Sequence, residues 1–163
     1  MITKSEKDTF KMKVVQFVMS KFNEESKLPP TALILNRKGA NKVFPIPHFL
    51  MDNERGKDKV HQLIIEALVL LDPKGFCFTT EAWASVQMVD KPSKDPDRDE
   101  IIMLAFEFED DDNEMMVFKI ERHDDGAVSL LLDHERTTKM GHNNTGIGGR
   151  FSNFLKDARK ARN

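Results

Sequence analysis

The sequence predicts an α+β fold, in which an antiparallel sheet of about four to six strands is covered by helices. Two segments carry hydrophobic residues at the three- and four-residue spacing of an amphipathic helix, whereas residues 76–132 alternate hydrophobic and polar residues as strands do. Short turn sequences separate the predicted strands. A chain of 163 residues has the size of one domain. We therefore expect a single α+β domain over residues 1–163, with the element order α-β-β-α-β-β-β-β-α.

The first predicted helix begins at Thr3 and Glu6, which have the spacing of a capping box. It ends within residues 23–30, because two consecutive prolines close that segment and proline is incompatible with a helix interior. One hydrophobic stripe runs along this helix and consists of Phe10, Val14, Phe17, Val18 and Phe22.

Residues 31–36 and 42–46 follow as a predicted hairpin, whose second strand contains Pro45 and is therefore expected at an edge of the sheet. Residues 48–58 are expected to be irregular or a frayed start of the next helix. The second helix, residues 60–71, has a wide hydrophobic face of the kind that packs against a sheet.

The central stretch is predicted to contain strands at residues 76–89, 101–109, 116–120 and 128–132, joined in an antiparallel meander. Asp125-Gly126 is a strong signal for a tight hairpin turn. We expect one face of the sheet to be hydrophobic and covered by helices, and the other to be charged and open to water.

The C-terminal part divides into a polar, glycine-containing segment and a last helix. Residues 135–149 are expected to be flexible, and residues 150–162 are expected to form a helix. The inward-facing residues of that helix are predicted to be Phe151, Phe154, Leu155 and Ala158.

Composition indicates a soluble protein of the cytoplasm. The net charge of −2 gives no general attraction to nucleic acid or membranes, and no hydrophobic run reaches the length of a membrane span. The first six residues are too polar for a secretory signal. Cys77 is the one cysteine, so no intrachain disulfide is expected.

Charge is unevenly distributed along the chain. Residues 90–125 contain 14 acidic against 5 basic residues, whereas residues 134–163 contain 7 basic against 2 acidic residues. The two regions either complement each other within the fold or present different surfaces to partners.

The strongest candidate for a binding surface combines one strand with the loop that follows it. Alternation places Glu81 and Trp83 on one side of their strand, and Pro92 and Pro96 stiffen the loop at residues 91–100. Trp and Arg are enriched at the centres of protein interfaces. The residues we expect to contact a protein partner are Glu81, Trp83, Ser93, Asp97, Arg98 and Glu100.

The alternative interpretation is structural. In that case the loop is held by its own hydrogen bonds, Arg98 pairs with an internal carboxylate such as Glu81, and Trp83 packs in the core. The binding interpretation depends on Arg98 and Trp83 lying at the same end of the sheet.

The pattern E-A-W followed by P-S-x-x-P-D-R-x-E resembles a group of small uncharacterised proteins of phages, prophages and bacteria. The similarity extends over roughly residues 60–155. It implies a phage-related or bacterial cytoplasmic origin, and it carries no established activity. The residues that form the pattern are Glu81, Ala82, Trp83, Pro92, Ser93, Pro96, Asp97, Arg98 and Glu100.

No catalytic or metal motif is recognisable, and we expect no cofactor and no bound metal. Residues 110–114 are acidic but lack the alternating ligands and the glycine of a calcium-binding loop, so a solvated hairpin tip is expected. Asp95, Asp97, Asp99 and Glu100 could surround a magnesium ion, although Lys94 and Arg98 interrupt them. Cys77 is interpreted as a small buried side chain rather than a nucleophile.

A second candidate site lies near the last helix. A glycine-rich loop before a helix can bind an anion through backbone N–H groups, and the helix that follows is basic. This site is neither a Walker loop nor a dinucleotide fingerprint. The residues proposed for phosphate or nucleic-acid binding are Gly148, Gly149, Arg150, Lys156, Arg159 and Lys160.

Two functions therefore remain open from sequence. The first is a non-enzymatic binding or accessory protein that engages a host or phage protein partner through the 91–100 loop. The alternative is a phosphate- or nucleic-acid-binding protein, with enzymatic activity left open, that uses the glycine-rich 145–150 loop and the acidic 95–100 loop. A scaffold that works by self-assembly is a third option, and the oligomeric state is left open.

Overall fold

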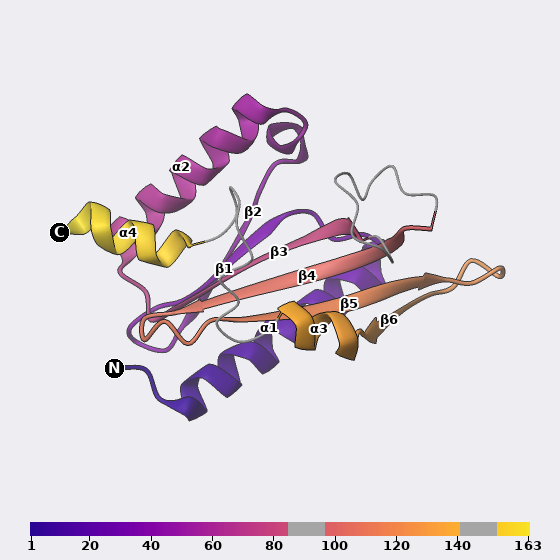
Figure 1. Ribbon diagram of the computed structural model, residues 1–163, viewed down its shortest axis with the longest axis horizontal. Helices are drawn as coiled ribbons and strands as arrows, with labels where there is room; N and C mark the ends of the chain where they lie inside the picture. Colours follow the sequence, from indigo (N-terminus) through magenta and orange to yellow (C-terminus); the bar gives the residue numbers. More distant parts are fainter. Residues whose placement is uncertain (85–96, 141–152) are drawn as a thin grey trace.

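The computed structural model describes residues 1–84, 97–140 and 153–163, with the side chains of residues 138–140 left out (Figure 1). One antiparallel sheet runs in the order β2-β1-β3-β4-β5-β6. The predicted fold class and strand count are confirmed. The strands are β1 (Thr31–Leu35), β2 (Asn41–Pro45), β3 (Gly75–Ala84), β4 (Asp99–Phe108), β5 (Glu114–Arg122) and β6 (Val128–Leu132). The helices are α1 (Lys4–Glu25), the short 3-10 helix η1 (His48–Met51), α2 (Glu54–Leu71), α3 (His134–Met140) and α4 (Phe154–Arg162).

Helix α1 begins at the predicted capping box. The Thr3 hydroxyl accepts the N–H of Glu6 at 3.2 Å, and the Glu6 carboxylate accepts the N–H of Thr3 at 2.8 Å. The helix ends at Ser26, which adopts the left-handed conformation with φ 55°. The hydrophobic stripe is buried at Phe10, Val14, Val18 and Phe22.

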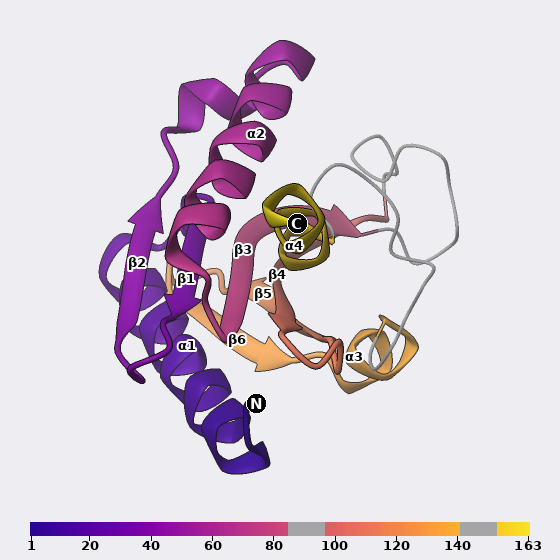
Figure 2. The same ribbon diagram turned by 90° about the vertical axis from the view of Figure 1, so that its left-hand side faces the viewer.

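Helices cover both faces of the sheet. Figure 2 shows α1 on one side, here called the α1 face, and α2 with α4 on the other, here called the α2 face. Within β1, Leu33 packs toward α1 and Ile34 toward α2. The expectation of one charged, open face was wrong, because β1 and the first half of β3 are hydrophobic on both sides and need cover on both.

The segment expected to be flexible from residue 135 begins with helix α3 instead. The Asp133 carboxylate accepts the N–H of Arg136 at 3.0 Å, which is the contact of an N-terminal cap. The Thr137 hydroxyl accepts the N–H of Val117 at 3.0 Å and so fixes the helix to β5. Residues 141–149 of that segment lie outside the described residues, and α4 begins at Phe154 rather than at residue 150.

In the central hairpin, strand β4 begins earlier than predicted. Strand β4 begins at Asp99, so Glu100 belongs to a strand and not to the loop that was expected to contain it. Strand β3 is described to Ala84. The rest of the predicted strand to residue 89, and the loop at residues 91–96 with Pro92, Ser93 and Pro96, lie outside the described residues.

Candidate functional site

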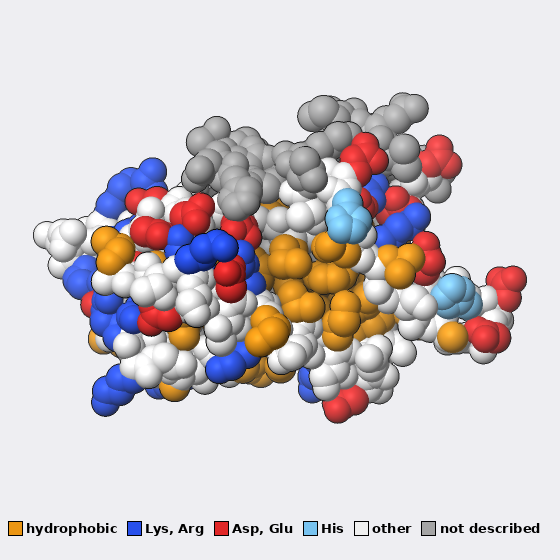
Figure 3. All heavy atoms as spheres, turned by 90° about the horizontal axis from the view of Figure 1, so that it is seen from below, with side chains coloured by type: hydrophobic (Ala, Val, Ile, Leu, Met, Phe, Trp, Pro, Cys, Tyr) orange, Lys and Arg blue, Asp and Glu red, His pale blue; other side chains and the backbone are white. Residues whose placement is uncertain are grey.

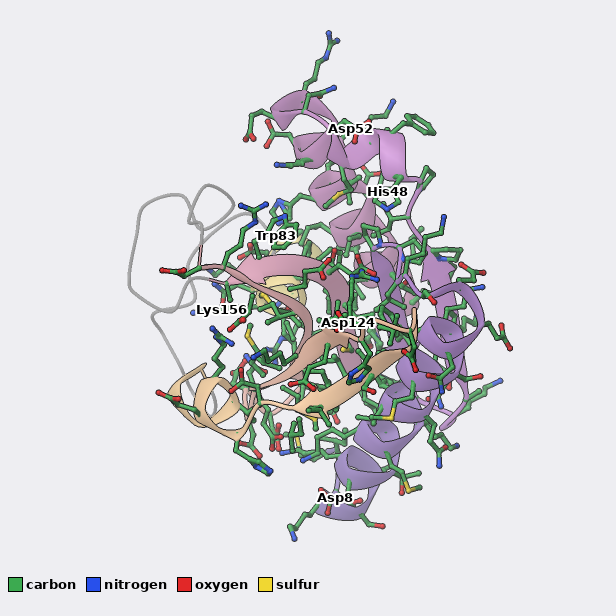
Figure 4. All side chains as sticks on the ribbon, turned by 90° about the vertical axis from the view of Figure 1, so that its right-hand side faces the viewer. Asp8, His48, Asp52, Trp83, Asp124 and Lys156 are labelled. Atoms are coloured by element: carbon green, nitrogen blue, oxygen red, sulfur yellow. The ribbon has the colours of Figure 1, made fainter. Side chains whose placement is uncertain are left out.

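The site predicted from sequence lies where the β3–β4 hairpin ends, on the α1 face. The two strands pair over their full length, with Trp83 opposite Glu100 and Glu81 opposite Ile102. Residues directly opposite each other point to the same face of a sheet. Glu81, Trp83 and Glu100 therefore share the α1 face with the buried Ile102. Figure 4 looks onto this end of the molecule, where Trp83 is labelled.

Trp83 and Arg98 are in contact. The guanidinium carbon of Arg98 lies 4.3 Å from the centre of the indole ring, which is the geometry of a cation–π interaction. Trp83 is 42% exposed, and Arg98 and Asp97 are exposed beside it. The expected meeting of indole and guanidinium at one end of the sheet is confirmed. The alternative that placed Trp83 in the core was wrong.

A second arginine completes this end of the sheet. The Nε of Arg122 donates to Glu100 at 2.7 Å and its Nη2 donates to the other carboxylate oxygen at 3.1 Å, so the two form a bidentate pair. Hydrogen bonding to Glu100 raises the pKa of Arg122. Sequence reasoning missed Arg122, although its alternation with Phe118 and Ile120 places it on the same face as those core residues.

Glu81 anchors the strand to the segment after α1. One of its carboxylate oxygens accepts the N–H of Leu28 at 2.6 Å, and Leu28 is buried. A charged acceptor on a backbone N–H makes a strong hydrogen bond. Glu81 therefore fixes the position of the chain that precedes β1 and holds the strand that carries Trp83.

At this same end of the sheet, a separate ionic cluster lies on the face opposite to Trp83. Arg136 of α3 donates to Asp99 at 2.9 Å and to Asp133 at 2.7 Å, and Lys119 lies 3.6 Å from Asp99. Residues 99 and 100 thus direct their carboxylates to opposite faces of β4, and each is paired with arginine. The start of β4 is fixed from both sides.

The second candidate site is engaged in internal contacts where it is described. The buried carboxyl group of Glu107 accepts the N–H groups of Phe154 and Leu155 at 3.2 and 3.0 Å, so the backbone N–H groups in the first turn of α4 are already engaged by a side chain of the protein. Arg159 donates to the carbonyl of Glu109 and to Asp111. Lys156 and Lys160 are exposed, and Gly148, Gly149 and Arg150 lie outside the described residues.

Within residues 1–84, 97–140 and 153–163, no group of His, Cys, Asp and Glu side chains is arranged to hold a metal ion. At the acidic tip of the β4–β5 turn, expected to be solvated, Lys7 lies 2.5 Å from Asp110 and 2.9 Å from Asp112. Cys77 is fully buried, and burial raises the pKa of its thiol well above the usual value. A buried, protonated thiol is a poor nucleophile.

Comparison with known proteins finds no family model, no curated protein and no solved structure that matches this chain. None of the helices in the described part is both long and hydrophobic enough to span a membrane.

Proposed function

We propose that this protein is a non-enzymatic binding protein of the bacterial or host cytoplasm that engages a protein partner of host or phage origin. The partner contacts the end of the β3–β4 hairpin on the α1 face, at Trp83 and Arg98. The observation that carries the proposal is a large aromatic side chain left 42% exposed and stacked against a guanidinium, although the sheet has a hydrophobic core on this face that could have buried it.

The chemistry of the pair defines the partner surface. The indole offers a flat hydrophobic face, and the guanidinium offers planar donors that match a carboxylate. A protein surface that combines an acidic side chain with a hydrophobic neighbour fits both. Tryptophan and arginine are the residue types whose truncation most often costs more than 2 kcal/mol at a protein interface.

The surroundings support a preformed surface. Glu81 is fixed by the N–H of Leu28, and Glu100 is held by the fork of Arg122. Immobilising side chains on binding costs free energy, and groups that are already held lose less. Ser93, Asp97 and Glu100 belong to the proposed surface by sequence; of these, Glu100 supports it through Arg122.

A phosphate- or nucleic-acid-binding role is the second candidate. The exposed Lys156 and Lys160 on α4 favour it. The occupied first turn of α4 and the internal contacts of Arg159 leave it fewer groups for a phosphate than the sequence had indicated. Steep weakening of binding with added salt is its signature.

The test compares matched arginine variants in affinity capture from a bacterial lysate. We expect Arg98→Ala and Trp83→Ala to lose a captured protein that the wild type and Arg55→Ala retain, since Arg55 is exposed on α2, which covers the other face of the sheet. The melting temperature should stay close to that of the wild type in all variants. Equal capture by wild type and Arg98→Ala would contradict the proposal.

The second candidate is tested on the same proteins. A thermal shift with nucleotides, or binding to an oligonucleotide that falls steeply with salt and is lost in a Lys156→Ala, Lys160→Ala double variant, would favour nucleic acid instead.

A further inference from the structure

The two edges of the sheet differ in how they are protected. Strand β6 is the last strand on one side, and no described segment pairs with its outer edge (Figure 1). Its sequence, Val-Ser-Leu-Leu-Leu, contains no charge, proline or glycine. Natural edge strands normally carry such residues, because an open hydrophobic edge pairs with other chains. Strand β2, at the other edge, contains Lys42 and Pro45.

The hydrogen bonds next to β6 show which of its backbone groups face outward. The N–H of Asp133 donates to the carbonyl of Val117, and the N–H of His123 donates to the carbonyl of Ala127. Residues alternate between facing the neighbouring strand and facing away. Val128, Leu130 and Leu132 therefore direct their N–H and C=O groups to the outer edge.

The same three residues carry hydrophobic side chains on the α1 face. They lie opposite Arg122, Ile120 and Phe118 in the register with β5. Val128 and Leu130 are partly buried against the α1-face core, and Leu132 is 36% exposed. Figure 3 shows the side of the molecule on which α1 lies, and a patch of hydrophobic side chains is exposed there.

The strand is complementary to itself. A two-fold axis at Leu130 places Leu130 opposite Leu130 of a second chain, and Val128 opposite Leu132. Each of these pairs joins residues with outward-facing backbone groups, and such antiparallel pairs exchange two hydrogen bonds each. The pairs formed by Val128, Leu130 and Leu132 are hydrophobic, and the remaining pair joins Ser129 to Leu131. No charged residue of β6 is therefore repelled or buried, and the hydrophobic rows of two molecules continue across the contact.

We infer that β6 is a self-association edge, through which two copies of this chain pair their β6 strands antiparallel and join their sheets into one. A two-fold contact of this kind closes on itself and stops at the dimer. The protected β2 edge at the far side of each sheet prevents continued growth.

Sedimentation equilibrium over a range of protein concentrations tests the contact. The wild type is expected to approach twice the mass of one chain as concentration rises. Leu130→Lys places two like charges opposite each other at the two-fold axis and should weaken association by about tenfold or more. Leu131→Lys is the matched control, because residue 131 points to the other face and does not oppose itself.

Mixing two oppositely charged variants of Leu130 gives the decisive test of the β6 pairing. Leu130→Lys and Leu130→Glu should each be monomeric, and an equal mixture should recover twice the mass of one chain, since lysine then faces glutamate. Hydrogen exchange of the wild type gives a result that needs no variant: the N–H groups of Val128, Leu130 and Leu132 should exchange more slowly as concentration rises. A wild type with the mass of one chain at every concentration would overturn the inference. So would association lost equally in Leu131→Lys.

Discussion

Glu107 is a carboxyl group removed from water by the first turn of α4. Burial raises its pKa from 4.5 to about 7, while the N–H groups of Leu155 and Phe154 act in the opposite direction. The charge of Asp157 raises the pKa further, and that of Arg159 lowers it. The side chain therefore changes protonation near neutral pH, at the point where the last helix joins the sheet.

The raised pKa of Glu107 makes the free energy of unfolding depend on pH in a defined direction. The folded state holds the proton more tightly than the unfolded state, so this contribution is fully present below about pH 4.5 and is lost as pH rises through about 7. In Glu107→Gln it is absent. We expect the difference in free energy of unfolding between wild type and variant to fall by about 3 kcal/mol across that window.

Denaturant unfolding at a series of pH values measures this difference. Glu66→Gln, an exposed glutamate on α2, serves as the control and should show no such trend. A difference that stays constant from acid to neutral pH would show that Glu107 is not the titrating group. Glu107→Gln should be less stable than wild type at acid pH, because its amide NH2 cannot accept a backbone N–H as the carboxyl oxygen does.

Among the elements, α2 is fixed to η1 by a close approach that only glycine permits. A Cβ atom at Gly56 would lie 2.2 Å from the carbonyl oxygen of Leu50. Alanine normally stabilises a helix by about 1 kcal/mol relative to glycine. Here the backbone contact reverses that preference, because η1 must move to make room.

We expect Gly56→Ala to lower the free energy of unfolding by roughly 1–3 kcal/mol. Arg55→Ala at the neighbouring exposed position should have little effect or a slightly stabilising one. Thermal or urea unfolding of the two variants gives the comparison. A stabilised Gly56→Ala would mean that η1 is not packed against α2 in solution.

The elements differ in how well the sequence predicts them. Helix α1 and the β5–β6 turn follow from local signals: a capping box at Thr3 and Glu6, and Gly126, which adopts φ 88°. Helix α3 was missed, because its start depends on Asp133 and its position on a hydrogen bond between Thr137 and the distant Val117. Short helices fixed by tertiary contacts have little periodic signal.

In the candidate site, too, local features were predicted from sequence and tertiary contacts were not. Alternation within one strand was enough to place Glu81 and Trp83 on one face. The fork of Arg122 on Glu100, and the pair of Arg136 with Asp99, connect residues on different strands and helices. Such pairs depend on strand register, which the sequence alone does not determine across three strands.

At the scale of the whole molecule, the sheet separates the core on the α1 face from two hydrophobic clusters on the α2 face, and α4 closes the one that α2 also covers. The ring of Phe154 lies 5.3 Å from that of Phe76, 6.0 Å from that of Phe78 and 5.0 Å from that of His61. Phe154 is fully buried. One residue of the last helix thus contacts both the sheet and α2.

Phe154→Ala should therefore lower the free energy of unfolding by about 3–5 kcal/mol, the usual cost of a large cavity in a core. Phe49→Ala, at a phenylalanine that is 69% exposed, is the control and should change it little. Denaturant unfolding checks both. A small loss in Phe154→Ala would show that α4 is not an integral part of the domain.

The order of the elements in the chain means that the site for α4, including Glu107, is synthesised before α4 itself. The residues of α2, β3 and β4 are made before Phe154, so Phe76 and Phe78 lack their contact with its ring while the nascent chain grows. The surface against which α4 packs is therefore synthesised before α4. We expect this part of the α2 face to stay accessible to chaperones until α4 has left the exit tunnel.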